Sequence, residues 1–198
     1  FMSLNGIDVS YDKKKQILKG LNLEVEEGEL VSLLGPSGCG KSTFVRMVIS
    51  LDKPTSGEIL YHGKNLAGLS KKETWLNRQN MQMVFQDPYA SLNPRMSVRD
   101  IVAEPLIIHG LTKTREETDQ KVVELLRRVG LDDYHANRYP HEFSGGQRQR
   151  ICIARALALN PKVVIADESV SALDVSIRAQ IINLLLDLQR DMGIAFLF

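Results

Sequence analysis

A short apolar run that enters a glycine-rich loop is the feature that most restricts how this chain can fold. Residues 30–34 (LVSLL) predict a short buried strand, and the spacing of the apolar residues in 44–48 predicts a helix. Between them, residues 35–42 carry the pattern G-x-x-x-x-G-K-S. A strand, a glycine loop and a helix in this order predict an α/β fold in which the loop opens the helix.

The loop has the composition and spacing of a polyphosphate-binding loop. Glycines let backbone N–H groups converge on phosphate oxygens, and the following helix adds the positive end of its dipole. Lys41 is expected to reach the β- and γ-phosphates of ATP, and Ser42 to offer its hydroxyl to Mg²⁺. A chance glycine-rich turn is the alternative, which the strand-to-helix context disfavours. The predicted nucleotide-binding residues of the loop are Gly35, Pro36, Ser37, Gly38, Cys39, Gly40, Lys41, Ser42 and Thr43.

Two acidic residues follow a second predicted strand. Residues 162–166 (KVVIA) run directly into Asp167 and Glu168. A phosphate-loop enzyme needs an acid that binds Mg²⁺ and, for hydrolysis, a base near the attacking water. We expect Asp167 to bind the metal and Glu168 to polarise the water. A solvated strand end with two acids is the alternative, and the phosphate-loop argues against it.

A second glycine-rich segment opens another predicted helix. Residues 143–150 (FSGGQRQR) precede a run with one apolar face. The segment closely resembles the LSGGQ motif of ABC ATPases, with Phe143 where leucine is usual. The resemblance implies a head-to-tail pair of subunits in which this segment closes over the nucleotide held by the partner. The residues that it places in trans at that interface are Ser144, Gly145, Gly146 and Gln147.

Three further positions resemble functional positions of the same family. Gln86 resembles the glutamine that senses Mg²⁺ and water and couples to the membrane subunits. Residues 171–174 (SALD) resemble the D-loop, with Asp174 at the dimer seam. Tyr11 resembles the aromatic residue that stacks on adenine; an aromatic that merely packs at the end of a strand is the alternative.

The resemblance implies the fold class. We expect an α/β phosphate-loop NTPase core with an N-terminal antiparallel β subdomain and an inserted α-helical subdomain. A single ABC ATPase domain over residues 1–198 would have its core at about 1–87 and 161–198 and its helical part at about 88–160.

Two helix starts, at Ser97 and Thr114, each have an acidic residue three positions later.

The chain departs from the family pattern near its end. Ser169 stands where proline usually follows the catalytic glutamate, and the switch histidine of the family lies beyond the strand predicted at 194–198. We therefore expect a C-terminal part to be missing. Phe1 precedes Met2, which indicates an added residue or a fragment of a longer chain.

Two segments narrow the resemblance within the family. Residues 87–95 (DPYASLNPR) and 139–143 (YPHEF) look like those of the oligopeptide, dipeptide and nickel importer ATPases. This implies an ATP-hydrolysing subunit of an importer for peptides or a related small solute. The implied partners are a second ATPase subunit, identical or a sister, two transmembrane permease subunits and, indirectly, an extracytoplasmic substrate-binding protein.

Composition sets the expected location. No stretch reaches the ~18 apolar residues of a membrane span, and no signal peptide opens the sequence. Two unpaired cysteines, Cys39 and Cys152, indicate a reducing compartment. We expect a subunit that is soluble when isolated and peripheral on the cytoplasmic face of the cell membrane. The net charge of +1 leads us to expect no nucleic-acid partner.

Two other interpretations stay open. One is an ATPase of DNA repair or chromosome organisation, but such heads are split by a long coiled coil. Here about a hundred residues separate Lys41 from Ser144, without sustained heptads. The other is a nucleotide-binding fragment without turnover, which Glu168 opposes for the parent protein and the missing histidine favours for this chain.

Overall fold

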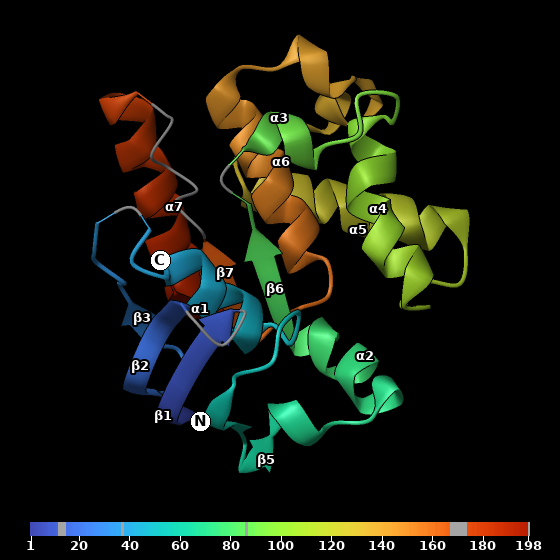
Figure 1. The fold of residues 1–198 in the computed structure, drawn as a ribbon. Helices are drawn as coiled ribbons and strands as arrows, with labels where there is room; N and C mark the ends of the chain where they lie inside the picture. The colour runs from blue at the N-terminus through green and yellow to red at the C-terminus, as the bar shows by residue number, and fades with distance from the viewer. Residues whose placement is uncertain (12–14, 37, 86, 167–173, 198) are drawn as a thin grey trace.

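The computed structural model describes residues 1–11, 15–36, 38–85, 87–166 and 174–197, and the side chains of Tyr11 and Lys15 lie outside this description. Strands occupy one half of the molecule and the helices α4, α5 and α6 gather in the other (Figure 1). In chain order the elements are β1 (Met2–Tyr11), β2 (Lys15–Val25), β3 (Leu30–Val31), α1 (Lys41–Val48), β4 (Ser56–Tyr61), β5 (Lys64–Asn65), η1 (Leu66–Gly68), α2 (Lys71–Asn80), β6 (Met81–Val84), α3 (Pro88–Ser91), α4 (Val98–Ile108), α5 (Arg115–Arg128), η2 (Asp133–Asn137), η3 (Pro140–Glu142), α6 (Gly145–Leu157), β7 (Val163–Ala166), α7 (Val175–Met192) and β8 (Ala195–Leu197).

The first sheet is antiparallel and has the order β2-β1-β4-β5. Its central strand β1 buries Met2 and Leu4, then Ile7 and Val9. The buried positions change from even to odd numbers between Leu4 and Ile7, where the pairing with β2 shifts register. An irregularity of this kind is what keeps the apolar side chains on one face when the chain gains a residue. The expected N-terminal antiparallel part is thereby confirmed.

The second sheet is parallel and has the order β3-β8-β7-β6. All four residues of β7 are buried, as expected for a strand covered on both faces. The expectation of a buried strand through residue 34 is wrong, because β3 ends at Val31 and Leu34 is 92% exposed. Val31 pairs with Leu197, and residues 32–36 that follow it belong to no strand.

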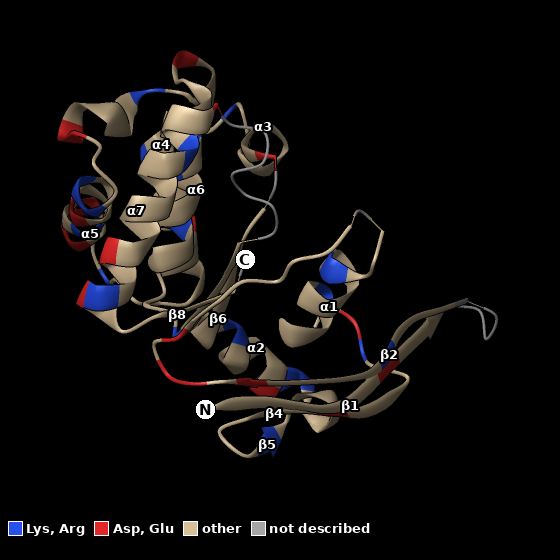
Figure 2. Cartoon of the chain, turned by 90° about the vertical axis from the view of Figure 1, so that its left-hand side faces the viewer, with Lys and Arg blue, Asp and Glu red and all other residues tan. Residues whose placement is uncertain are grey.

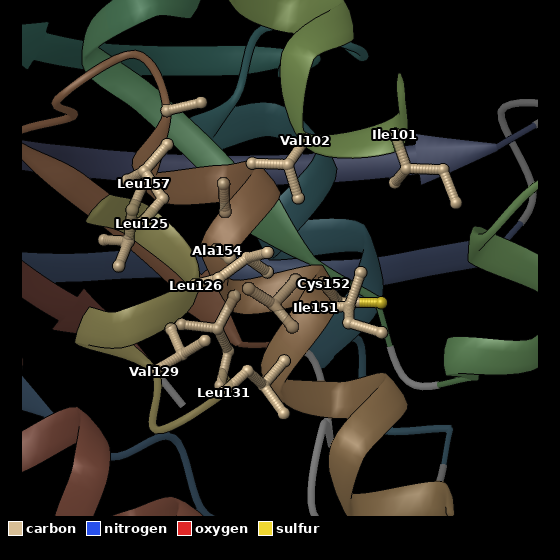
Figure 3. Packing of buried hydrophobic residues seen from close by; sticks show 14 of the residues in the cluster. Ile101, Val102, Leu125, Leu126, Val129, Leu131, Ile151, Cys152, Ala154 and Leu157 are labelled. Carbon is tan, nitrogen blue, oxygen red and sulfur yellow. The ribbon is translucent and has the colours of Figure 1, made fainter. Parts of the chain in front are cut away.

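Two helices of the helical half begin at the predicted serine and threonine caps. The Ser97 hydroxyl oxygen accepts the Asp100 N–H at 3.2 Å, and the Thr114 hydroxyl oxygen accepts the Glu117 N–H at 3.1 Å, which caps α4 and α5. After α5, Gly130 takes a φ of +74°. Apolar side chains of α4, α5 and α6 point toward one another and form one core (Figure 3).

Two apolar clusters meet at the parallel sheet. One joins α4–α7 to the sheet face that carries Val164, and the other joins α1 and the antiparallel sheet to the face of Val163 and Ile165. Adjacent residues of β7 thus belong to different clusters, as the alternation of a strand requires. The helical cluster continues into the sheet at Val84 and Val164, so the predicted boundary between core and helical parts stays a prediction.

Two neighbouring isoleucines of α7 provide a test of this packing. Ile181 is fully buried in the helical cluster, whereas Ile182 is 37% exposed. We expect Ile181→Ala to lower the free energy of unfolding by about 2–5 kcal/mol, because it leaves a cavity. Ile182→Ala should change it by less than about 1 kcal/mol. Urea unfolding followed by circular dichroism measures both, and equal losses would contradict the assigned face of α7.

Candidate functional site

The glycine loop leads from the end of β3 into α1 and packs against β2. Gly40 caps α1 in the left-handed conformation with φ +102°. A Cβ atom at Gly40 would lie 2.8 Å from Leu18 Cδ2 and 3.0 Å from Ile17 Cγ2. The position therefore needs glycine both for its backbone angle and for the close approach to β2. This contact fixes the loop directly before the first helical turn.

The start of α1 is electropositive. Its first turn carries no acidic side chain, and α1 shows basic but no acidic residues in Figure 2. The Lys41 ammonium donates to the carbonyl oxygens of Gly35 at 2.7 Å and Pro36 at 3.2 Å, so it lies over the loop. The exposed helix end, its dipole and this ammonium together favour an anion.

The predicted residues of the loop differ in exposure. Lys41 and Thr43 are half-buried, Gly40 is buried, and Ser37 lies outside the described residues. The exposed members are Gly35, Pro36, Gly38, Cys39 and Ser42. Ser42, the predicted Mg²⁺ ligand, thus faces solvent in the first turn of α1.

The strands that carry the other predicted residues end at the same edge of the sheet. β6 and β7 are parallel, and their last residues Val84 and Ala166 pair. Gln86 comes two residues after β6, and Asp167 and Glu168 follow β7 directly. These three residues lie outside the described part of the chain, as does the side chain of Tyr11 at the end of β1. The structure therefore places the ends of β6 and β7 at one edge of the sheet, and it does not describe the predicted side chains that follow them.

The second glycine-rich segment opens α6 through a capping box. The Ser144 hydroxyl oxygen accepts the Gln147 N–H at 3.3 Å, and the Gln147 side-chain oxygen accepts the Ser144 N–H at 3.0 Å. Ser144 itself is exposed and Gly145 is half-buried. Because the Ser144 oxygen accepts in this pair, its own proton is left to donate.

Gly146 brings α6 against α7. A Cβ atom at Gly146 would lie 2.6 Å from Ile177 Cγ2, so a larger residue there would force Ile177 to shift. Ile177 lies in the first turn of α7, three residues after Asp174, which is exposed and precedes the helix. The contact brings the first turns of α6 and α7 together, and with them the residues predicted at the dimer interface.

Sequence reasoning gave no role to Arg148 or Tyr89. Arg148 is only 6% exposed, its guanidinium carbon lies 3.5 Å from the centre of the Tyr89 ring, and it donates to the Tyr89 hydroxyl. It also donates to the carbonyl of Pro140 at 3.2 Å. The sequence did contain one indication of a shared contact surface: Arg148 and Arg155 are seven residues apart, which puts both arginines on one side of a helix.

The same stretch of α6 buries polar atoms without hydrogen-bond partners. Nε of Arg148 and both side-chain amide atoms of Gln149 make no hydrogen bond in the described part of the chain. Gln149 is 0% exposed. Each such atom costs about 1–3 kcal/mol of stability.

A groove of about 910 Å³ runs between β6 and the C-terminal half of α4. Apolar and charged residues share its lining, among them Phe85, Ile108 and Glu104. At one end His109 stacks on Trp75 at 4.4 Å between ring centres and hydrogen-bonds with Gln79 at 2.8 Å. Burial lowers the pKa of His109 below its usual value, which favours the neutral ring there.

The cysteines are free thiols with different surroundings. Cys39 is exposed in the loop, whereas burial in α6 raises the pKa of Cys152 to about 11. Within the described ranges, no group of three or more His, Cys, Asp or Glu side chains could hold a metal ion. None of the described helices is long and apolar enough to cross a membrane.

The sequence matches known proteins over most of its length. Residues 18–171 match the model of the family described as ABC transporter. The chain is 57% identical over 179 residues to the oligopeptide transport ATP-binding protein OppF of Bacillus subtilis, covering 90% of this chain and 59% of OppF. It is 58% identical over 178 residues to the glutathione import ATP-binding protein GsiA of Escherichia coli K12, covering 90% of this chain and 28% of GsiA. The chain thus spans less than two thirds of these relatives.

Solved structures resemble the whole fold. The structure of cbiO1 from Clostridium perfringens, part of the ABC transporter complex cbiONQ, has a TM-score of 0.90 at 31% identity and covers 99% of this chain and 76% of that chain. A dimeric post-hydrolysis structure of the ATP-binding cassette MJ0796 with ADP and Pi has a TM-score of 0.87 at 35% identity and covers 100% of this chain and 86% of that chain. The predicted fold class is confirmed, and the chain belongs to the ABC transporter family.

Proposed function

We propose that this chain is the ATP-binding and ATP-hydrolysing subunit of an ABC importer for peptides or a related small solute. The observation that carries the proposal is that β3, β6 and β7 belong to one parallel sheet. Their carboxyl ends lead into the glycine loop, Gln86 and the acid pair respectively. Ligands of open α/β sheets bind outside the carboxyl ends of parallel strands.

The loop holds the phosphates of ATP. Backbone N–H groups of residues 35–43 surround the polyphosphate, and a phosphate oxygen is a stronger acceptor for an ammonium than a neutral carbonyl. The β- and γ-phosphates therefore draw Lys41 from the carbonyls of Gly35 and Pro36. Tyr11, at the end of β1, stacks on the adenine.

Hydrolysis needs a metal ion and a base at the same edge. The exposed hydroxyl of Ser42 suits Mg²⁺, because the first turn of α1 holds no acid that would compete for it. Together with Ser42, Asp167 and Gln86 would hold the ion. Bound Mg²⁺ would neutralise charge on the phosphate oxygens. Glu168 accepts a proton from the water that attacks the γ-phosphorus, and ADP and phosphate leave.

A second ATPase subunit completes the site. Ser144 has a proton to donate and lies at the positive end of α6, so it suits a γ-phosphate that the partner's loop holds. Gly145, Gly146 and Gln147 keep this turn narrow, and the exposed Asp174 lies at the seam. The dimeric cassette MJ0796 supports such a pairing by likeness. The partner is identical or a sister chain.

The groove between β6 and α4 supports docking of the permease subunits. It is open, and Phe85 is 45% and Ile108 61% exposed beside charged residues, a mixture that suits the short cytoplasmic segment of a membrane protein. We propose that the groove receives one of two transmembrane permease subunits, which makes the ATPase subunit peripheral on the cytoplasmic face of the membrane. An extracytoplasmic binding protein delivers the solute. The oligopeptide and glutathione names of the relatives favour peptides as cargo.

The first test of this proposal is Glu168→Gln in the full chain. The change removes the base but keeps the shape and hydrogen-bonding capacity of the side chain. We expect ATP turnover to fall by at least about 100-fold, while the Kd for ATP stays within about threefold. Phosphate release and binding of a fluorescent ATP analogue measure the two. Glu124→Gln, on the solvent side of α5, is the control, and persistent turnover in Glu168→Gln would refute the assignment of the base.

The second test compares two serines that cap helices in the same way. In the Glu168→Gln background, Ser144→Ala should abolish ATP-dependent dimerisation while monomers still bind ATP. Ser97→Ala loses an equivalent cap, about 1 kcal/mol, but contacts no nucleotide, so its dimer should persist. Analytical ultracentrifugation with and without ATP measures dimerisation. If both variants dimerise equally, Ser144 does not act on the partner's nucleotide.

A further inference from the structure

Two arginines of α6 hold α3, the short helix that follows Gln86. Arg148 and Arg155 are seven residues apart, about two helical turns, so they lie on the same side of α6. Arg155 donates to the carbonyl oxygen of Ser91 at 2.7 Å. Arg148 stacks on the ring of Tyr89 with 3.5 Å between its guanidinium carbon and the ring centre. α3 is thereby fixed to α6 near both of its ends.

The pair of Arg148 and Tyr89 is unequal in burial. Arg148 is 6% exposed, whereas Tyr89 is 66% exposed, so the tyrosine covers the arginine from the solvent side. A guanidinium that is shielded from water binds an aromatic face more strongly than an exposed one. Its further bond to the Pro140 carbonyl ties η3 to the same side chain. One buried cation therefore joins α3, η3 and α6.

These contacts connect two parts of the proposed ATP site. Arg148 lies one turn after Ser144 in the rigid helix α6. Tyr89 lies three residues after Gln86, and its N–H is held by the Asp87 carboxylate at 2.8 Å. The segment that leaves the sheet edge after β6 is thus joined to the start of α6 through one side-chain stack.

We propose that Arg148 is a positioning residue that sets Ser144 relative to the segment after Gln86 by its stack on Tyr89. The guanidinium is planar and rigid, so a shift of residues 87–91 moves the first turn of α6 with it. Residues 87–95 (DPYASLNPR), which narrowed the family resemblance, thereby acquire a physical role through Tyr89. This inference rests on the proposed function, because Ser144 acts on the nucleotide of the partner subunit.

The test removes the aromatic ring of Tyr89, the exposed partner of the stack. In the full chain, Tyr89→Leu should lower kcat for ATP by at least about tenfold, because a displaced catalytic group is costly even at about 1 Å. The KM for ATP should stay within about twofold, since the loop that binds the nucleotide in the same chain is untouched. Tyr89→Phe keeps the ring face and should retain kcat within about threefold.

A second tyrosine–arginine pair supplies the matched control. Tyr134 is 58% exposed, and the guanidinium carbon of Arg138 lies 5.1 Å from its ring centre. Both residues belong to the surface around η2 and not to α6. Tyr134→Leu should leave kcat within about twofold of the wild type. The substitution removes a tyrosine–arginine contact at the surface, but neither residue of this pair belongs to α6 or to the proposed ATP site.

A measurement that does not depend on turnover separates this inference from the proposed function. Hydrogen exchange of the backbone amides of residues 146–150 should be faster in Tyr89→Leu than in wild type and unchanged in Tyr134→Leu. Unchanged exchange in Tyr89→Leu, or an unchanged kcat in an active protein, overturns the positioning role. A wild-type chain without turnover contradicts the proposed function alone, and faster exchange in Tyr89→Leu would still support the link.

Discussion

The burial of β7 between two parallel neighbours is the constraint on which the rest of the structure depends. Its residues alternate between two apolar clusters, with Val163 and Ile165 on one face and Val164 on the other. A slip of one residue would exchange these faces, so packing on both sides fixes the register. The register in turn fixes the position of Ala166, the last residue of β7, which Asp167 and Glu168 follow in the sequence. The place of the proposed chemistry is therefore set by apolar packing.

The helix α6 extends this control to the second half of the site. It is buried along most of its length and touches α3, α4, α5 and α7. Gly146 fixes its first turn against Ile177, and Arg148 fixes it against Tyr89. The position of Ser144 at its end thus depends on both the start of α7 and the segment that follows β6.

The sequence revealed the features that depend on local spacing. The glycine loop before α1, the caps at Ser97 and Thr114 and the apolar strand β7 lie where the patterns predict them, because each involves residues a few positions apart. The exposure of Leu34 was not predictable, because β3 is defined by pairing with residues far away in the sequence, and a short apolar run does not reveal where such pairing stops. The stack of Arg148 on Tyr89 joins residues 59 positions apart, so the spacing of Arg148 and Arg155 indicates a shared side of α6 but not the partner that Arg148 contacts.

The two halves of α6 differ in what they contribute. Beyond Ile151 the helix buries mostly apolar side chains, which stabilise the helical cluster. In its first two turns it buries Arg148 and Gln149, with three polar atoms that have no hydrogen-bond partner among the described residues. Apolar side chains of similar volume would avoid a cost of about 1–3 kcal/mol per atom. Stability alone does not account for a polar first half, whereas the proposed role of Arg148 in positioning Ser144 gives a reason for its buried guanidinium. The apolar half of α6 anchors the helix so that its polar half can position the site.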